Sequence, residues 1–461
     1  MLIVFIVLYV VITLAVGIYA SKFVKNTDDY LLAGRKFPWY ISSAALFATW
    51  FGSETVLGTS SQFAKEGFSG IIEDPIGAAL CLLLLGLFFA KPLYRMNFLT
   101  FGDFYRVKYG KVAELIASIF LIISYLGWIA AQMIAIGVIL NVVIGIPIFI
   151  GTIIGSCIVI SYTFIGGMWS VVLTDFIQTI TIIIGLIITT IIVMNKKEIV
   201  DVFHQTPSHY FEMFPKSGST NFLNYFAALI TIGLGSIPQQ DIYQRVMSSK
   251  SERTAVVSSY IAAIMYLSIA LLPLILTLYA INLSPQLLKN STQLLIPNFI
   301  KLYTPFFVQV LFYGALLAAI MSTASGAIIA PAAILSENIF KHLFFKNISD
   351  KQFLLLSRIS VLIVAIISLI MALIRNNIYE LVGESSILSL VALFVPLTAG
   401  LIFKNSNSLG AILSMLFGMS AWLIAKFIGT EINELLYGLL ASFFGMFIGY
   451  IYYKFRENSP G

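Results

Sequence analysis

The chain has 461 residues, of which 59 % are hydrophobic and 10 % are charged, and its formal net charge is +6. Soluble globular chains have about 45–50 % apolar and about 25 % charged residues. This chain therefore cannot cover a water-facing surface, and we expect a polytopic membrane protein whose outer surface contacts the lipid bilayer. The small net charge and the lack of a basic stripe exclude a nucleic-acid-binding protein.

Apolar stretches recur along the whole chain. Each is close to or above the roughly 20 residues that a spanning helix needs, and none alternates as the strands of a membrane barrel do. We therefore predict an all-α fold with about 13 transmembrane helices in one transmembrane domain, residues 1–461. The predicted spans are 2–20, 39–65, 71–95, 112–141, 146–164, 168–194, 221–246, 255–283, 304–340, 353–375, 379–403, 409–428 and 432–454.

Basic residues in the connections predict the orientation. With the N-terminus placed outside, 19 of the 27 Lys and Arg residues fall in segments on the inner side. The positive-inside rule then predicts a plasma-membrane protein, in the inner membrane of a bacterium, with the N-terminus outside and the C-terminus in the cytoplasm. Residues 1–21 lack the basic start of a signal peptide, so we expect the first helix to be retained.

Two predicted helices contain interruptions. The second contains the polar and small residues Ala48–Thr55, and the seventh contains the segment from Gly233 to Asp241. One such segment alone would suggest a Gly/Pro kink, but two of them, five helices apart, indicate an inverted-repeat transporter with its site at the breaks. The predicted parts are an extra N-terminal segment, two five-helix repeats and two extra C-terminal helices, over residues 1–38, 39–194, 221–403 and 409–461.

The ninth predicted helix carries hydroxyl side chains on one face. Ser322 and Thr323 follow Ala319 by three and four positions, so the three residues share a face. Hydroxyls and free backbone carbonyls are the hard oxygen ligands that an alkali ion prefers, and this face could form half of a sodium shell. The alternative is structural, because small residues pack helices closely and Ser and Thr bond back to their own helix.

A carboxylate lies inside a predicted span at Asp175, about two turns from its start. Such a charge costs about 2.5–3.5 kcal/mol on insertion scales, so a cation, hydroxyl groups or water must stabilise it. Either Asp175 balances a transported cation, in which case Asp175→Asn should lower turnover and keep the folded fraction, or it anchors the structure. Four further acids lie closer to helix ends, namely Glu73, Asp74, Asp241 and Glu384. Each could belong to a functional site, and the alternative is that each is solvated at the membrane interface.

Two tryptophans lie at mid-membrane positions. Trp50 falls in the first break, and Trp128 lies in the middle of the fourth predicted helix. Tryptophan faces can enclose an organic cation through the ring quadrupole. The alternative is that both rings only pack against lipid or neighbouring helices.

Several sequence blocks together resemble a known family. They are ATWFGSETVLGTS from Ala48, YTFIGGMWSVVLTDFIQ from Tyr162, GSIPQQDIYQRVMSSKS from Gly235 and AAIMSTASG from Ala318. The chain resembles the sodium/solute symporters, and most of all their high-affinity choline transporter branch. The resemblance implies a transporter rather than an enzyme, with ten core helices in two inverted repeats.

The resemblance also implies a sodium site. Its ligands would be three backbone carbonyls and two hydroxyls, those of Ala48, Phe51, Ala319, Ser322 and Thr323. Members with two sodium ions use the acid at Asp175 and a pair of serines. Ser325 matches one of these serines, but the next position is Gly326, so the number of sodium ions stays open.

The choline cage of the family is matched in part. Trp50 and Trp128 match two of its aromatic positions, whereas Gln239 and Ala78 stand where two further aromatics are expected. The predicted substrate-binding residues are Trp50, Trp128, Gln239 and Gln240. The expected function is sodium-coupled import of a small organic solute, with choline or a related compact cation as the first candidate. A proline-type amino-acid symporter and a non-transporting sensor are the alternatives, and the sequence leaves the oligomeric state open.

Overall fold

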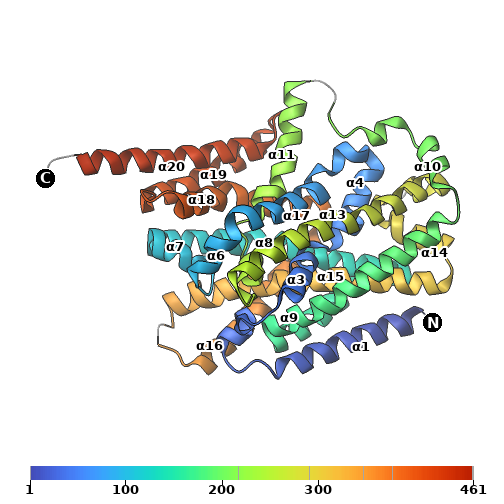
Figure 1. Cartoon of the computed structure of the whole chain (residues 1–461), viewed down its shortest axis with the longest axis horizontal. Helices are drawn as coiled ribbons and strands as arrows, with labels where there is room; N and C mark the ends of the chain where they lie inside the picture. Colours follow the sequence, from blue (N-terminus) through green and yellow to red (C-terminus); the bar gives the residue numbers. More distant parts are fainter. Residues whose placement is uncertain (1, 216–217, 290, 346, 376, 459–461) are drawn as a thin grey trace.

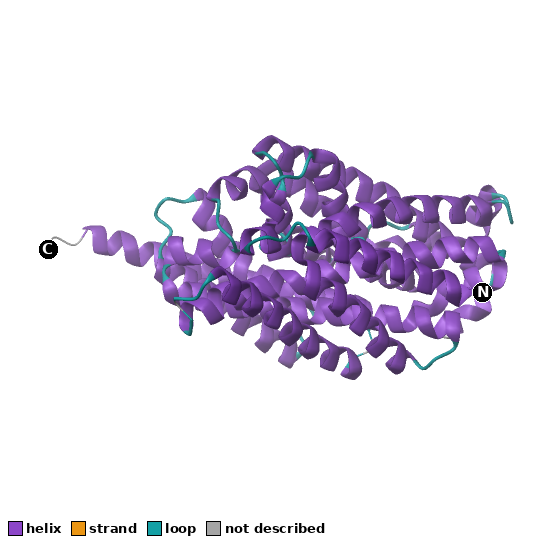
Figure 2. Cartoon of the chain, turned by 90° about the horizontal axis from the view of Figure 1, so that it is seen from below, coloured by secondary structure: helices purple, strands orange, loops and turns teal. Residues whose placement is uncertain are grey.

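The computed structural model of the protein describes residues 2–215, 218–289, 291–345, 347–375 and 377–458. Within these ranges the chain forms helices and loops, and no strand occurs apart from one isolated bridge between Phe37 and Ser249 (Figure 2). The prediction of an all-α fold is therefore confirmed.

The long helices run side by side along the longest axis of the molecule, and the two termini lie at opposite ends of it (Figure 1). The first half of the chain forms α1 (Leu2–Ser21), α2 (Thr27–Leu32), α3 (Trp39–Trp50), α4 (Thr59–Glu66), α5 (Ala78–Leu84), α6 (Ala90–Met96), α7 (Phe101–Tyr109), α8 (Lys111–Ile144), α9 (Ile148–Met194) and α10 (Ile199–Gln205). The second half forms α11 (Ser219–Gly235), α12 (Gln240–Ser248), α13 (Glu252–Leu283), α14 (Leu295–Tyr303), α15 (Phe306–Ile334), α16 (Asp350–Ile374), α17 (Ile378–Ser389), α18 (Val395–Ile402), α19 (Ser408–Ile428) and α20 (Glu434–Asn458).

Among the described residues, five segments contain wider π-helical turns, and one of them, η4 (Ile72–Gly77), is interrupted at Asp74, whose dihedral angles are not helical. The five are η2 (Glu54–Gly58), η4, η5 (Leu85–Phe89), η9 (Leu335–Lys341) and η10 (Leu390–Phe394). Such turns shift the helix register and often occur at functional sites. Two of them, η2 and η4, supply carboxylates to the site described below.

Every predicted span has a helical counterpart, but some spans are joined. Among the described residues, nine helices are long and apolar enough to cross a membrane, or ten if the bent pair α11 and α12 is one span. The helix α9 covers two predicted spans and changes direction at Gly167, whose φ of 55° is left-handed. A Cβ at Gly167 would meet the Tyr30 ring at 2.4 Å, so glycine is required there. The count of thirteen crossings stays a prediction.

Both predicted helix breaks are confirmed. The helix α3 ends at Trp50, Phe51 has non-helical dihedral angles, and π-helical turns resume at Glu54. The helices α11 and α12 meet at an angle of 45° across the four residues 236–239. The rest of the bundle surrounds these breaks: α8, α15 and α17 are the most buried spans, and α19 and α20 are the least buried.

Candidate functional site

The broken end of α3 frees one backbone carbonyl. In a continuous helix the N–H of Gly52 would donate to Ala48 O, but here it donates to Trp50 O at 2.8 Å. Ala48 O instead accepts a hydrogen bond from Thr323 Oγ1 at 3.2 Å and lies 3.0 Å from Ser322 Oγ, whose one hydrogen is shared with Asp175. The break therefore brings a free carbonyl and two hydroxyls of α15 together, and this all-oxygen, neutral donor set fits an alkali ion.

The other two predicted sodium ligands lie on the same elements. Phe51 is fully buried directly after the end of α3, and Ala319 is fully buried one turn before Thr323 on α15. Whether their carbonyls complete the sodium shell stays a prediction.

Asp175 lies beside this site and is paired with an arginine. Its Oδ1 accepts from Ser322 Oγ at 2.5 Å, and its Oδ2 lies 3.4 Å from Arg245 Nη2. Both charged side chains are fully buried. A buried pair of this kind tolerates the loss of neither partner, so Asp175 already has a fixed cation.

The space beside Asp175 is filled by that arginine. A Cβ at Gly326 would lie 2.3 Å from Arg245 Nη2, so a serine does not fit at this position without moving the guanidinium. Ser325 Oγ donates to Ser322 O at 3.0 Å, which is a bond within its own helix. The contacts of Ser325 and Gly326 thus offer little support to a second sodium ion.

A small buried cavity lies between the two breaks. Its volume is about 10 Å³, which is room for about one water molecule. Ala78 and eight polar or aromatic side chains contribute to its lining, the eight being Trp50, Glu54, Asp74, Trp128, Ser236, Gln239, Tyr266 and Ser386. Three of the four predicted substrate-binding residues therefore line a common cavity.

The two tryptophans are fixed by carboxylates. Trp50 Nε1 donates to Asp241 Oδ2 at 3.2 Å, which connects the break of α3 directly to α12. Trp128 Nε1 donates to Glu54 Oε1 at 3.1 Å. Because each indole N–H already has an acceptor, each ring is held in place beside the cavity.

The cavity contains two carboxylates that lack a basic partner. Glu54 is 3 % exposed and Asp74 is 1 % exposed. In the described part of the chain neither forms an ion pair, whereas Glu114, Asp175 and Glu384 each do. Buried charge without a partner is costly, so the cavity is suited to a cation.

Glu54 is the cavity residue that sequence reasoning missed, whereas Asp74 was named there as one of four acids for which interfacial solvation was the alternative to a site. Glu54 was not singled out, although a glutamate inside a broken helix is itself a signal of function. For Asp74 and Asp241 the interfacial alternative is wrong, since both are fully buried and hydrogen-bonded. Glu384 is partly exposed and pairs with Arg375 and Lys426, as expected of an interfacial acid.

Gln240 is not among the residues that line the cavity, and its predicted role in substrate binding stays a prediction. Its Oε1 accepts from Phe101 N at 2.8 Å, and its Nε2 donates to Leu99 O at 3.4 Å. The side chain therefore fastens the start of α12 to the loop before α7. Gln239, one position earlier, lines the cavity, and its Oε1 has no hydrogen-bond partner among the described residues.

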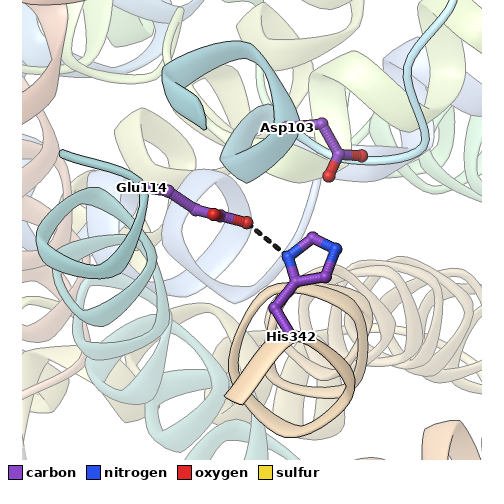
Figure 3. A group of neighbouring side chains, drawn as sticks. All are labelled: Asp103, Glu114 and His342. Carbon is purple, nitrogen blue, oxygen red and sulfur yellow. Dashed lines mark hydrogen bonds and ion pairs between the residues drawn. The ribbon is translucent and has the colours of Figure 1, made fainter. Parts of the chain in front are cut away.

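A second polar cluster lies at the N-terminal end of α8 (Figure 3). Asp103, Glu114 and His342 lie close enough to suggest a metal centre. However, His342 Nε2 is 2.6 Å from Arg106 Nη1 and must accept from it, so Nδ1 carries the hydrogen that is donated to Glu114 Oε1 at 2.6 Å. With both ring nitrogens used, the cluster is better described as a polar contact between α8 and the end of α15–η9.

Discontinuous helices that meet at a buried polar cavity are the architecture of secondary transporters, and the fold places this chain in that class. A model described as "Sodium:solute symporter family" matches residues 30–418. The chain belongs to this family and is a sodium-coupled symporter of a small solute.

Similar proteins agree with this assignment. The human "High affinity choline transporter 1" is 29 % identical over 434 residues, which are 90 % of this chain and 75 % of that protein. The "High-affinity proline transporter PutP" of Bacillus subtilis (strain 168) is 24 % identical over 465 residues, covering 97 % and 96 % of the two chains. The outward-open structure of a Na+-coupled sialic acid symporter shares the fold, with a TM-score of 0.85, 21 % identity and 98 % and 97 % coverage.

Proposed function

We propose that the protein imports a small organic cation together with sodium across the plasma membrane, with choline as the first candidate. The observation that carries this proposal is the cavity between the breaks, where two tryptophan rings accompany two carboxylates without a basic partner. Aromatic faces and carboxylates both attract an ammonium group. The similarity to choline transporters supports the same substrate class.

Sodium is the proposed coupling ion. It would bind the freed Ala48 carbonyl and the hydroxyls of Ser322 and Thr323, with the carbonyls of Phe51 and Ala319 as further ligands. An ion held there connects α3 to α15 and stabilises the outward-open form, in which the solute then binds. The proposed orientation has the N-terminus outside and the C-terminus in the cytoplasm. The membrane potential adds about 2.3 kcal/mol per 100 mV to the driving force for import of each positive charge.

A proline-type solute is the second candidate, because the free amide oxygen of Gln239 offers a hydrogen-bond acceptor in the cavity. The carboxylate of an amino acid would, however, enter a cavity that already contains Glu54 and Asp74. Negatively charged carboxylates that are close together repel strongly in a buried site, so the cavity favours a cation over a zwitterion. The third alternative, a sensor without transport, would be excluded by a measurement that shows accumulation of solute against its gradient.

The comparison of Trp50→Leu with Gln239→Ala tests the substrate class. We expect Trp50→Leu to raise the half-saturating choline concentration about two- to thirtyfold, because a ring contributes about 0.5–2 kcal/mol to a desolvated cation. Gln239→Ala is the matched control, since it also shortens a cavity side chain but removes no aromatic face. Sodium-driven uptake into proteoliposomes is the measurement, with potassium replacing sodium as the blank. A larger effect of Gln239→Ala would favour a proline-like solute, and no effect of either variant would place the site elsewhere.

A further inference from the structure

Asp74 differs from the other cavity carboxylate in the type of its hydrogen-bond partners. Tyr266 OH lies 2.8 Å from Asp74 Oδ1, and Thr59 Oγ1 lies 2.9 Å from Asp74 Oδ2. A hydroxyl group can both donate and accept. The same two contacts therefore suit a charged carboxylate and a protonated carboxylic acid.

Each of these hydroxyls also has a second acceptor for its own hydrogen. Tyr266 OH can donate to Trp50 O at 3.1 Å, and Thr59 Oγ1 can donate to the backbone oxygen of Asp74 at 3.3 Å. If Asp74 carries a proton, that proton can be donated to one hydroxyl oxygen while the hydroxyl hydrogen turns to the backbone. Thr55 Oγ1 lies 2.6 Å from Tyr266 OH and can donate its hydrogen to the phenol oxygen, so the protonated form leaves none of these donors without an acceptor.

Glu54 provides the contrast within the same cavity. Its two oxygens accept from Trp128 Nε1 at 3.1 Å and from Gln132 Nε2 at 2.7 Å. The amide orientation of Gln132 is fixed because its Oε1 accepts from Ser53 N at 3.0 Å. N–H groups only donate, so these two contacts suit the charged form of Glu54, and its one hydroxyl neighbour, Ser53 Oγ, lies farther away at 3.5 Å from Oε2.

The space around Asp74 is too small for an organic cation in this geometry. The cavity has a volume of about 10 Å³, and Asp74 forms no ion pair with the described basic residues. The titratable side chains that face it from the packed elements are Glu54 on η2, Glu73 on η4, Tyr266 on α13 and Tyr379 on α17. None of them supplies a positive charge, and a proton needs no additional space in the cavity.

We propose that Asp74 exchanges a proton for the cationic solute, so that the transporter exports one proton for each solute cation that it imports. On the outer side, the arriving cation pairs with the carboxylate, and the proton leaves to the external solution. On the inner side, the cation leaves, and Asp74 takes up a proton from the cytoplasm before the carrier returns. This proposal rests on the proposed function, since it requires a cationic solute.

The protonation of Asp74 can be tested without any solute. In purified full-length protein in detergent, the infrared difference spectrum of wild type minus Asp74→Asn should contain the C=O band of a protonated carboxylic acid. Asparagine keeps the size of the side chain and can still bond both hydroxyls. The matched variant Glu54→Gln should give no such band in its difference spectrum. The absence of the band from the Asp74→Asn difference would overturn the proposal.

The exchange itself is tested in proteoliposomes that enclose a pH-sensitive dye, with choline and sodium outside. Choline uptake should make the lumen alkaline, by one proton per choline. Gln239→Ala should keep this ratio at a lower rate, and Asp74→Asn should remove the pH change from the remaining uptake. Uptake of choline without a pH change would contradict the exchange but not the proposed function. Failure to take up any organic cation would contradict the proposed function, and the infrared band alone would then decide the protonation of Asp74.

Discussion

The substitution Asp175→Asn should destabilise the folded transporter by about 3–5 kcal/mol, because it leaves one partner of a buried ion pair without the other. Asp175 and Arg245 are both fully buried with 3.4 Å between their charged atoms, so Asp175→Asn leaves a guanidinium without its anion. The expected results are a lower melting temperature in detergent and less monodisperse protein. The sequence left two roles for Asp175 open, a balancing charge for a transported cation and a structural anchor, and the buried arginine favours the anchor.

The double variant Asp175→Asn with Arg245→Gln is the control for this prediction. It removes both charges and keeps hydrogen-bonding side chains at both positions, so it should recover much of the lost stability. The difference between the double variant and the sum of the single variants measures the coupling between the two residues. An unchanged melting temperature in Asp175→Asn would show that Arg245 finds another anion, and Asp175 would then be free to bind a cation.

Removal of the α15 hydroxyls should raise the sodium concentration needed for half-maximal uptake. Each hydroxyl bonds the freed Ala48 carbonyl, and loss of one ligand at about 1 kcal/mol corresponds to about a fivefold change. Thr323→Ala is the cleaner of the two variants, since Ser322 also bonds Asp175. The effect of both changes together should be larger but not additive, because the residues are neighbours.

Ser325→Ala is the matched control on the same helix. Its hydroxyl is bonded to Ser322 O rather than to Ala48 O, so the change removes the same atoms without touching the proposed shell. Uptake measured over a range of sodium concentrations at constant ionic strength gives the comparison. Equal sodium dependence in Ser322→Ala, Thr323→Ala and wild type would remove these residues from the sodium site.

The sequence predicted the helix breaks because their signal is local. Glycine, proline and polar residues interrupt apolar stretches at Ala48–Thr55 and at residues 233–241, and both interruptions are breaks in the structure. The shared face of Ser322 and Thr323 was equally local, since it depends only on helix periodicity. The family resemblance already implied the Ala48 carbonyl as a ligand, and the structure places that carbonyl against this face.

Contacts between distant segments could not be predicted in this way. Asp175 and Arg245 are 70 positions apart, and Glu54 and Trp128 are 74 apart. Their pairing depends on how whole helices pack, so Asp175 was described without its partner and Glu54 was missed. The different positions of Gln239 and Gln240 have a similar cause, because neighbouring residues point in different directions: Gln239 lines the cavity, and Gln240 bonds the segment at the start of α7.

The bond between Trp50 and Asp241 has a practical consequence. It joins the two breaks at 3.2 Å, so any motion that separates the halves of the transporter changes the polarity around one indole ring. Trp50 is one of only five tryptophans in the chain, and replacement of the other four by phenylalanine would leave it as a single fluorophore. Its emission would then report the opening and closing of the carrier in real time, without any attached label.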